Sequence, residues 1–430
     1  MILQNVKGSM DYLPEEQILR NKIINTLSKT FEEYGYLPVE TTTLCYYDLL
    51  ASKYAGGAEI LKEVYKLKDQ GERDLALRYD LTVPFAKIIS MNKGLNLPFR
   101  RYEIGKVYRD GPVKVGRNRE FYQCDVDVCG IEGQFPEAEL FKMAFSGYQK
   151  LGLDVYLEWN NRKFLSGLIT YCGIEESLVS NVILSVDKLA KIGSEGVRKE
   201  LEEYQIDNQK LDKLFEYFKL DISVLEETFK DIDNDLLKEG IKEVLSLNHY
   251  ITEMNLTDCK FTPYLARGLE IYTGTVWEIF DKNQILTCAL GGGGRYDNII
   301  TKFINDGKSY PAVGMSFGLV PIAEILSKKA NEELTNLYDF YIIPYDDNAN
   351  VLSLKLAESL REKGIRVVIE MNHRKVKKSF EWANKNNIPY VTVIGDSELE
   401  SKKINVKNMY SGESSEYSID NLEELISKVK

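Results

Sequence analysis

The stretch that decides the fold runs from Arg101 to Asp127 and reads RYEIGKVYRDGPVKVGRNREFYQCDVD. Two segments of alternating residues flank a turn-forming Asp110-Gly111-Pro112 group, which predicts an antiparallel strand pair joined by a basic loop with Lys114 and Arg117.

The second segment separates its two faces by the period of two that strands have. The polar face carries, in order, Arg119, Phe121, Gln123, Asp125 and Asp127. A guanidinium, an aromatic ring, an amide and carboxylates in this order can bind an anion, stack a flat ring and hold a cationic group. The plainer interpretation is a solvent-exposed strand face, because single patterns carry a false-positive risk.

The rest of the chain predicts an α+β architecture in two domains. Residues 14–34 have the apolar stripe of an amphipathic helix. Strands without regular strand–helix alternation indicate a mainly antiparallel sheet; we expect them around residues 36–46, 63–68, 74–78, 264–280 and 285–290. Between about 170 and 255, apolar residues recur at helical spacing, which predicts a helical insertion.

After a polar linker at 328–335, strand and helix patterns alternate, which predicts a small α/β domain. The expected domains are therefore 1–327, which contains the insertion, and 336–430.

Composition excludes several classes of protein. No run of about 18 apolar residues is present, so no membrane-spanning helix is expected. The N-terminus lacks the pattern of a signal peptide, and the six cysteines have no paired spacing, so we expect a cytoplasmic protein without a structural metal site. A net charge of −11 argues against a general nucleic-acid coat but allows local basic patches, such as the one at 374–378.

Two glycine-rich segments admit two interpretations each. Gly291-Gly-Gly-Gly-Arg295 lacks the spacing of a nucleotide-binding fingerprint, and it predicts a tight turn or the close approach of a ligand, with a flexible loop as the plainer interpretation. The segment 313–322 leads from a glycine-containing strand into a helix. This pattern predicts either that the N-terminus of the helix binds a phosphate or that the glycines let the helix pack closely on the sheet.

Taken in order, these segments resemble the histidyl-tRNA synthetase family of the class II aminoacyl-tRNA synthetases. Residues 101–127 resemble the second motif of the class, and residues 314–322 stand in the place of the third. Residues 265–272 (LARGLEIY) and 292–297 (GGGRYD) resemble two histidine-specific signatures, and 78–82 (RYDLT) a histidine-binding strand. The resemblance covers the whole chain and implies a class II antiparallel sheet flanked by helices, with a helical insertion and a C-terminal α/β domain of the anticodon-binding type.

The resemblance also implies a reaction, in which a homodimer activates histidine with ATP and Mg²⁺ and transfers it to the 3′ end of tRNA(His). The implied catalytic residues are Arg109 and Arg267. The implied ATP-binding residues are Arg109, Arg117, Arg119, Phe121 and Gly318. The implied histidine-binding residues are Asp80, Thr82, Gln123, Asp127, Arg267, Tyr272 and Gly292. The implied tRNA-binding residues are Arg374, Lys375, Lys377 and Lys378.

Within this set, the resemblance implies that Asp80, Thr82 and Gln123 bind the α-amino group of histidine. It implies that Asp127 and Tyr272 bind the imidazole.

Three positions depart from the family pattern. Pro321 stands where the third motif normally carries an arginine, Thr42 where the first motif has a proline, and Ile271 where a second tyrosine is common. The alternative function is therefore a synthetase-like paralogue without ligase activity, the regulatory subunit of ATP phosphoribosyltransferase. The retained arginines and the C-terminal domain favour the enzyme.

Overall fold

The structure is a computed structural model that describes residues 3–53, 61–113, 117–267, 271–329, 337–372 and 374–430. The chain divides into two compact units, Met1–Lys329 and Ala330–Lys430, and each is described by itself. The linker segment 330–335, Lys114, Gly268, Glu270 and His373 lie outside the described residues.

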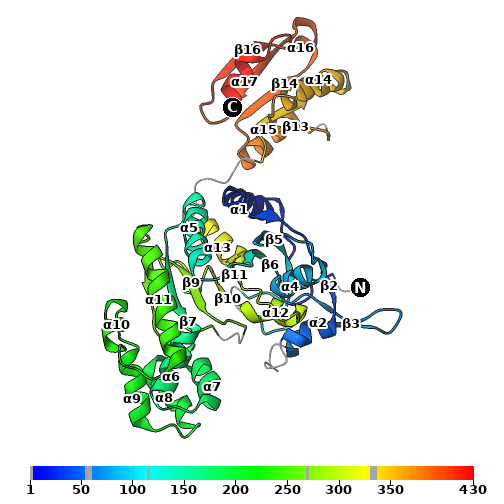
Figure 1. The fold of residues 1–430 in the computed structure, drawn as a ribbon. Helices are drawn as coiled ribbons and strands as arrows, with labels where there is room; N and C mark the ends of the chain where they lie inside the picture. Colours follow the sequence, from blue (N-terminus) through cyan, green and yellow to red (C-terminus); the bar gives the residue numbers. More distant parts are fainter. Residues whose placement is uncertain (1–2, 54–60, 114–116, 268–270, 330–336, 373) are drawn as a thin grey trace. The chain divides into compact units, whose positions relative to one another are not determined.

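An eight-stranded sheet forms the first unit, with the order β1-β5-β6-β11-β10-β9-β7-β8 (Figure 1). Neighbouring strands among the six inner ones run antiparallel to one another, and these strands are β5 Phe99–Tyr108, β6 Glu120–Cys129, β11 Ala312–Gly318, β10 Gly291–Arg295, β9 Thr275–Asp281 and β7 Val155–Asn161. The edge strands β1 Leu37–Pro38 and β8 Cys259–Phe261 pair parallel to β5 and β7. The predicted strand pair and the mainly antiparallel α+β sheet are therefore confirmed.

Three helices pack on the apolar face of this sheet, namely α1 Pro14–Glu33, α5 Phe135–Lys150 and α13 Leu319–Lys329 (Figure 1). Cys124, Val126 and Val128 of β6 are buried in this core. Because side chains alternate along a strand, the polar residues of β6 point to the opposite face.

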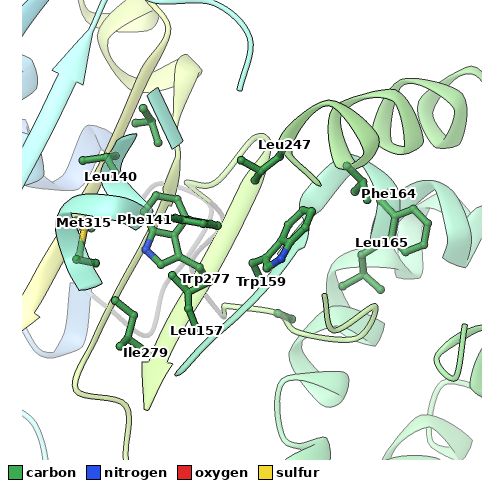
Figure 2. Close-up of a cluster of buried hydrophobic side chains, with 14 of the residues drawn as sticks. Leu140, Phe141, Leu157, Trp159, Phe164, Leu165, Leu247, Trp277, Ile279 and Met315 are labelled. Carbon is green, nitrogen blue, oxygen red and sulfur yellow. The ribbon is translucent and has the colours of Figure 1, made fainter. Parts of the chain in front are cut away.

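The core continues into the helical insertion without a break. Trp277 of β9 packs edge-on against Phe141 of α5, and Figure 2 shows Trp159 of β7 beside Leu247. The insertion comprises α6 Arg162–Tyr171, α7 Val179–Val186, α8 Leu189–Glu202, α9 Asn208–Tyr217, α10 Leu225–Thr228 and α11 Asp235–Glu253, with 3₁₀ turns at Glu176–Leu178 and Ile222–Val224. It begins earlier than the predicted residue 170, because the Asn161 side chain accepts hydrogen bonds from two backbone N–H groups and starts α6 directly after β7.

The polar face of the sheet is bordered by smaller elements. They are α2 Tyr47–Lys53, α4 Thr82–Met91, α12 Asp297–Ile304 and a three-stranded sheet of β2 Leu44–Tyr46, β4 Asp74–Leu77 and β3 Lys66–Lys68. Phe85 and Ile89 of α4 share a buried cluster with Ile299 and Ile300 of α12, which fixes these two helices side by side.

The expected strand at 285–290 is wrong, and so are the tight turn and the flexible loop considered for the four glycines; the approach of a ligand to this segment stays a prediction. Gly291 to Gly294 form β10 themselves, paired on both sides with β9 and β11. A Cβ atom on Gly293 would lie 2.2 Å from the carbonyl oxygen of Gly314, and one on Gly294 would lie 2.5 Å from the Tyr272 ring. The glycines are required because a neighbouring strand and a tyrosine ring approach this backbone more closely than any side chain permits.

The second unit contains a mixed five-stranded sheet in the order β13-β12-β14-β15-β16. The predicted strands are present as β12 Phe340–Pro344, β13 Val367–Ile369 and β14 Tyr390–Ile394, all parallel. The unpredicted strands β15 Lys403–Asn408 and β16 Ser414–Ser418 extend the sheet antiparallel. The helices are α14 Asn350–Arg361, α15 Val376–Lys385, α16 Asp396–Ser401 and α17 Glu423–Val429, with a 3₁₀ turn at Asp347–Ala349.

Helix α11 packs closely against α6 at glycine residues, and a substitution can test whether this packing requires glycine. A Cβ atom on Gly240 would lie 2.2 Å from the backbone nitrogen of Phe164. Alanine is normally the better helix former by about 1 kcal/mol. The clash reverses this preference, so we expect Gly240→Ala to lower the free energy of unfolding by about 1–3 kcal/mol.

Urea unfolding measures the effect, and Gly94→Ala is the matched control because a Cβ atom at Gly94 would meet nothing within 4 Å. A Gly240→Ala protein as stable as the parent would contradict the close crossing.

Candidate active site

Two adjoining cavities lie on the polar face of the sheet. The larger has a volume of about 410 Å³ and the smaller about 150 Å³. Six residues line both, namely Tyr79, Arg109, Gln123, Arg267, Gly292 and Ser316. Molecules bound in the two cavities would therefore meet at a wall that carries two guanidinium groups.

The larger cavity combines cations with aromatic surface. The guanidinium of Arg109 lies 4.4 Å from the Tyr79 ring centroid and 5.1 Å from that of Phe121. Arg117, which is exposed, and Gly318 also line this cavity. A planar ring can stack on Phe121 while arginines bind anionic groups, an arrangement suited to a nucleotide.

Arg119 differs from the other predicted ATP-binding residues, because it is absent from the described lining of both cavities. Its guanidinium lies 3.3 Å from the Asp110 carboxylate, and its Nε donates to the Gly111 carbonyl oxygen at 3.2 Å. In this structure Arg119 therefore holds the turn between β5 and β6.

The smaller cavity brings together the whole predicted histidine-binding set, which is Asp80, Thr82, Gln123, Asp127, Arg267, Tyr272 and Gly292. These residues come from β6, β10, the start of α4 and the segment before β9. Asp80 is fixed because its Oδ1 accepts hydrogen bonds from the backbone N–H groups of Thr82, at 3.1 Å, and Val83, at 2.9 Å.

A buried charge network lies beneath this cavity. Arg101 of β5 is fully buried, and its Nη2 lies 2.7 Å from Asp127 Oδ2. The Tyr296 hydroxyl donates to the other oxygen of Asp127. On the neighbouring side, Glu103 lies 2.8 Å from Arg78 and 3.5 Å from Arg101. One oxygen of Asp127 thus accepts a hydrogen bond, and the other is in an ion-pair contact that lacks hydrogen-bond geometry.

Sequence reasoning placed Asp125 on the polar face without giving it a role, and it did not assign Arg101, Glu103 or Tyr296 to the site. The signal lies in the strand register, which pairs Arg101 with Asp127 and Glu103 with Asp125. Charged residues alternate on both strands, but the sequence shows which of them lie opposite one another only when the register of the two strands is known.

Burial raises the pKa of both β6 carboxyl groups above the usual range. For Asp125 the charge of Asp127 adds to the effect of burial, and Arg101 opposes it. For Asp127 burial is again the main cause, and Arg101 and the Tyr296 hydroxyl oppose it. Burial alone would lower the pKa of Arg101, but the carboxylates of Asp127, Asp125 and Glu103 together raise it.

Arg267 is positioned at the wall between the cavities. Its Nη1 donates to the Tyr272 hydroxyl at 3.3 Å, and its Nε lies 3.8 Å from Glu278. Because Tyr272 and Glu278 hold the guanidinium, little reorganisation is needed when negative charge develops at this wall.

The predicted tRNA-binding residues gather at the start of α15 in the second unit. Arg374, Lys375, Lys377 and Lys378 are all exposed, and the first turn of α15 has no acidic residue. Cations at a helix N-terminus oppose the helix dipole, so the charges of Lys375, Lys377 and Lys378 do not stabilise the helix. Arg374 lies 3.6 Å from the Glu370 carboxylate and 5.6 Å from the centroid of the Trp382 ring. The four side chains form a positive surface suited to a polyanion.

The fold and the paired cavities define a catalytic domain of the class II aminoacyl-tRNA synthetase type. A sequence profile of the histidyl-tRNA synthetase family matches residues 8–322, and one of the anticodon-binding domain matches residues 339–429. The chain belongs to the histidyl-tRNA synthetase family.

Individual relatives agree with this assignment. Histidine–tRNA ligase 1 of Bacillus cereus is 48% identical over 418 residues, which cover 96% of each chain. The histidyl-tRNA synthetase structure from Nostoc sp. PCC 7120 has a TM-score of 0.86 at 27% identity and covers 100% of this chain and 99% of its own. An ATP phosphoribosyltransferase regulatory subunit/histidyl-tRNA synthetase from Bacillus halodurans C, at 21% identity and a TM-score of 0.74, shares the fold; the match covers 89% of this chain and 96% of the other.

None of the described helices is long and apolar enough to cross a membrane. Over the same part of the chain, no group of three or more His, Cys, Asp or Glu side chains could hold a metal ion.

The raised pKa of Asp125 predicts a pH-dependent stability. The folded protein holds this proton more tightly than the unfolded chain, so the stabilisation is present at acid pH and is lost as the pH rises above the usual carboxyl range. Asn has the same shape without the charge. We expect Asp125→Asn to raise the melting temperature relative to the parent, and to do so more at about pH 8 than at about pH 5.

Thermal unfolding at both pH values measures the difference, with the exposed Asp231→Asn as control. A melting-temperature change that is equal at both pH values would contradict the assigned titration.

Proposed function

We propose that this chain is a cytoplasmic histidine–tRNA ligase. It activates histidine with ATP to histidyl-adenylate and pyrophosphate, and then transfers the histidyl group to the 3′ end of tRNA(His). The observation that carries the proposal is the shared wall of the two cavities, where Arg109 and Arg267 both stand. A reaction that joins the occupants of the two cavities requires such cations at their junction.

Histidine occupies the smaller cavity in this proposal. Its α-ammonium group binds to Asp80, Thr82 and Gln123, and its ring points toward Tyr272 and the buried carboxylates of β6. Its carboxylate then lies at the shared wall. Binding energy from the ammonium group and the ring thus positions the reacting oxygen.

ATP occupies the larger cavity, with its adenine ring on Phe121 and its outer phosphates near Arg117. A carboxylate oxygen of histidine attacks the α-phosphorus, and the bond to the pyrophosphate oxygen breaks, so no proton moves in this step. Arg109 and Arg267 stabilise the negative charge that develops on the α-phosphoryl oxygens. No histidine side chain is needed as a general base.

Mg²⁺ is expected to arrive with ATP, mainly on phosphate oxygens, because oxygen ligands from the substrate are usual for this ion. Among the described lining residues of the larger cavity, Glu63 is the one with a carboxylate. Its Oε2 accepts a hydrogen bond from the Tyr79 hydroxyl at 3.0 Å, which fixes the group in place. The ion supplies charge stabilisation on the phosphates, and Glu63 offers it an oxygen ligand.

Pro321 lines the larger cavity at the position of the class arginine, so the site lacks that cation. This supports the alternative function, a regulatory subunit without ligase activity. Two features argue against the regulatory subunit. The cavity lining retains Arg109, Arg117 and Arg267, and the anticodon-binding domain matches residues 339–429. Histidine-dependent exchange of pyrophosphate into ATP, with the other amino acids as controls, separates the functions: activity with histidine alone supports the ligase, and none supports the paralogue.

A homodimer is part of the proposal, because large apolar side chains remain exposed on several elements of the first unit. They belong to β1, β2 and α4 and are Leu37 (65% exposed), Leu44 (53%), Tyr46 (59%) and Met91 (74%). A second copy of the chain would cover them. Sedimentation at micromolar concentration tests this part, and a monomer would contradict it.

Replacing the cation at the shared wall should slow activation. We expect Arg267→Ala to reduce pyrophosphate exchange by about 10²–10³-fold, the usual loss when one charge partner of a transition state is removed. Arg366→Ala in the second unit, whose partner is Asp339 at 2.5 Å, is the matched control and should leave exchange unchanged. Wild-type exchange in the Arg267→Ala protein would remove this residue from the reaction.

Neutralising the basic surface of α15 should affect only the second step. We expect replacement of Arg374, Lys375, Lys377 and Lys378 by Gln to weaken tRNA charging and its dependence on salt, because phosphate contacts release counterions. Histidine activation should stay intact. The control replaces the exposed Lys355 and Lys363. Equal losses in charging and activation would show that the α15 residues support folding instead.

A further inference from the structure

The segment that brings Arg267 to the shared wall of the two cavities is anchored by one side chain of β7. Asn160 is fully buried, and its Nδ2 donates to the carbonyl oxygens of Pro263 and Leu265, each at 2.9 Å. Its Oδ1 has no hydrogen-bond partner among the described atoms, so the amide acts through its donors. Asn160 is absent from the described lining of both cavities, so it holds backbone and does not contact a substrate.

Asn160 reaches this segment because its side chain lies on the polar face of the sheet. The register pairs it with Val276 of β9, two residues from Glu278 (Figure 1). Paired residues, and residues two apart on one strand, share a face, so Asn160 and Glu278 lie on the same side. The preceding residue, Trp159, belongs to the buried core on the other side. The segment after β8 therefore passes Asn160 of β7 before Arg267 meets Glu278 of β9.

Backbone hydrogen bonds fold this segment into a turn that ends just before the arginine. The Thr262 N–H donates to the Trp159 carbonyl oxygen, and the Leu265 N–H donates to the Thr262 carbonyl oxygen, both at 2.8 Å. Within the described parts of the chain, no hydrogen bond reaches the backbone of Ala266 or Arg267. The Leu265 carbonyl, held by the amide of β7, is therefore the last fixed backbone group before Arg267.

The side-chain contacts of Arg267 orient its guanidinium, but neither of them is close. The hydrogen bond to the Tyr272 hydroxyl is 3.3 Å long, and the ion pair with Glu278 is 3.8 Å long. Hydrogen bonds from N–H to oxygen are usually about 2.9–3.0 Å long. The place of the guanidinium thus depends on the backbone that carries it, and a misplacement of about 1 Å can cost about 100-fold in rate.

We propose that Asn160 is a positioning residue for the activation step. Its amide holds the Leu265 carbonyl, and this holds the Arg267 guanidinium at the shared wall, where negative charge develops. Without the amide the guanidinium moves away from that charge, and the rate of activation falls. This inference rests on the proposed function, which places Arg267 on the α-phosphoryl oxygens.

Steady-state pyrophosphate exchange by the full chain provides the first test. We expect Asn160→Ala to lower kcat about 10- to 100-fold with the KM for ATP unchanged, because a misplaced group acts on the transition state. Asn234→Ala is the matched control, since this side chain caps α11 and donates to Thr170 Oγ1 at 3.0 Å inside the insertion. The control should keep the parental kcat. A parental kcat in the Asn160→Ala protein would overturn the assignment.

A double substitution shows whether Asn160 acts through Arg267. We expect Asn160→Ala to cause no further loss in the Arg267→Ala background, because no guanidinium remains to be positioned. A double variant that is slower than Arg267→Ala by the full factor of the single Asn160→Ala change would overturn the proposal. Asn160→Leu fills a similar volume without a donor, and it replaces the alanine variant in both tests if that variant does not fold.

Amide hydrogen exchange tests the anchor without turnover. We expect the Thr262 and Leu265 amides to exchange faster in the Asn160→Ala protein than in the parent, because the turn has lost its side-chain anchor. Arg267→Ala leaves the anchor in place and should keep the parental exchange rates. Unchanged rates in the Asn160→Ala protein would overturn the proposal. A parent that exchanges no pyrophosphate would contradict the ligase function, and the amide rates would still decide the anchor.

Discussion

The buried contact between Arg101 and Asp127 is the interaction on which the rest of the site depends. Both side chains are at most 5% exposed, and moving each charge out of water costs several kcal/mol. The pair is tolerated because further bonds surround it: Arg101 donates to the Leu81 carbonyl oxygen, and Tyr296 donates to Asp127. These bonds join β5, β6, the start of α4 and the start of α12 at one point, which is the floor of the smaller cavity.

This floor imposes conditions on the rest of the sheet. A Cβ atom on Gly314 of β11 would lie 1.9 Å from Asp127 Oδ1. Only glycine therefore fits at this position, opposite the Arg101–Asp127 pair. Glycines on β10 allow the neighbouring strand and the Tyr272 ring to approach in the same way. The glycine-rich segments therefore shape the cavity by bringing backbone and side chains close.

The alternation in residues 119–129 was sufficient to predict which side chains of β6 face the site, because strand periodicity is local. The resemblance added Asp80, Arg267 and Tyr272, which come from distant segments and share the smaller cavity with Gln123 and Asp127. Periodicity could not reveal that β10 is a strand, since four glycines have neither a face nor β propensity. Nor could it reveal that Arg119 holds a turn. Such facts depend on strand register and on contacts between strands.

The most direct test of this account is a crystal structure of the full chain with histidine bound. The account predicts the α-ammonium group at Asp80 and Gln123, the imidazole between Tyr272 and the carboxylates of β6, and an Arg101–Asp127 contact that is unchanged. Histidine bound outside the smaller cavity, or an Arg101–Asp127 contact that histidine binding breaks, would contradict it.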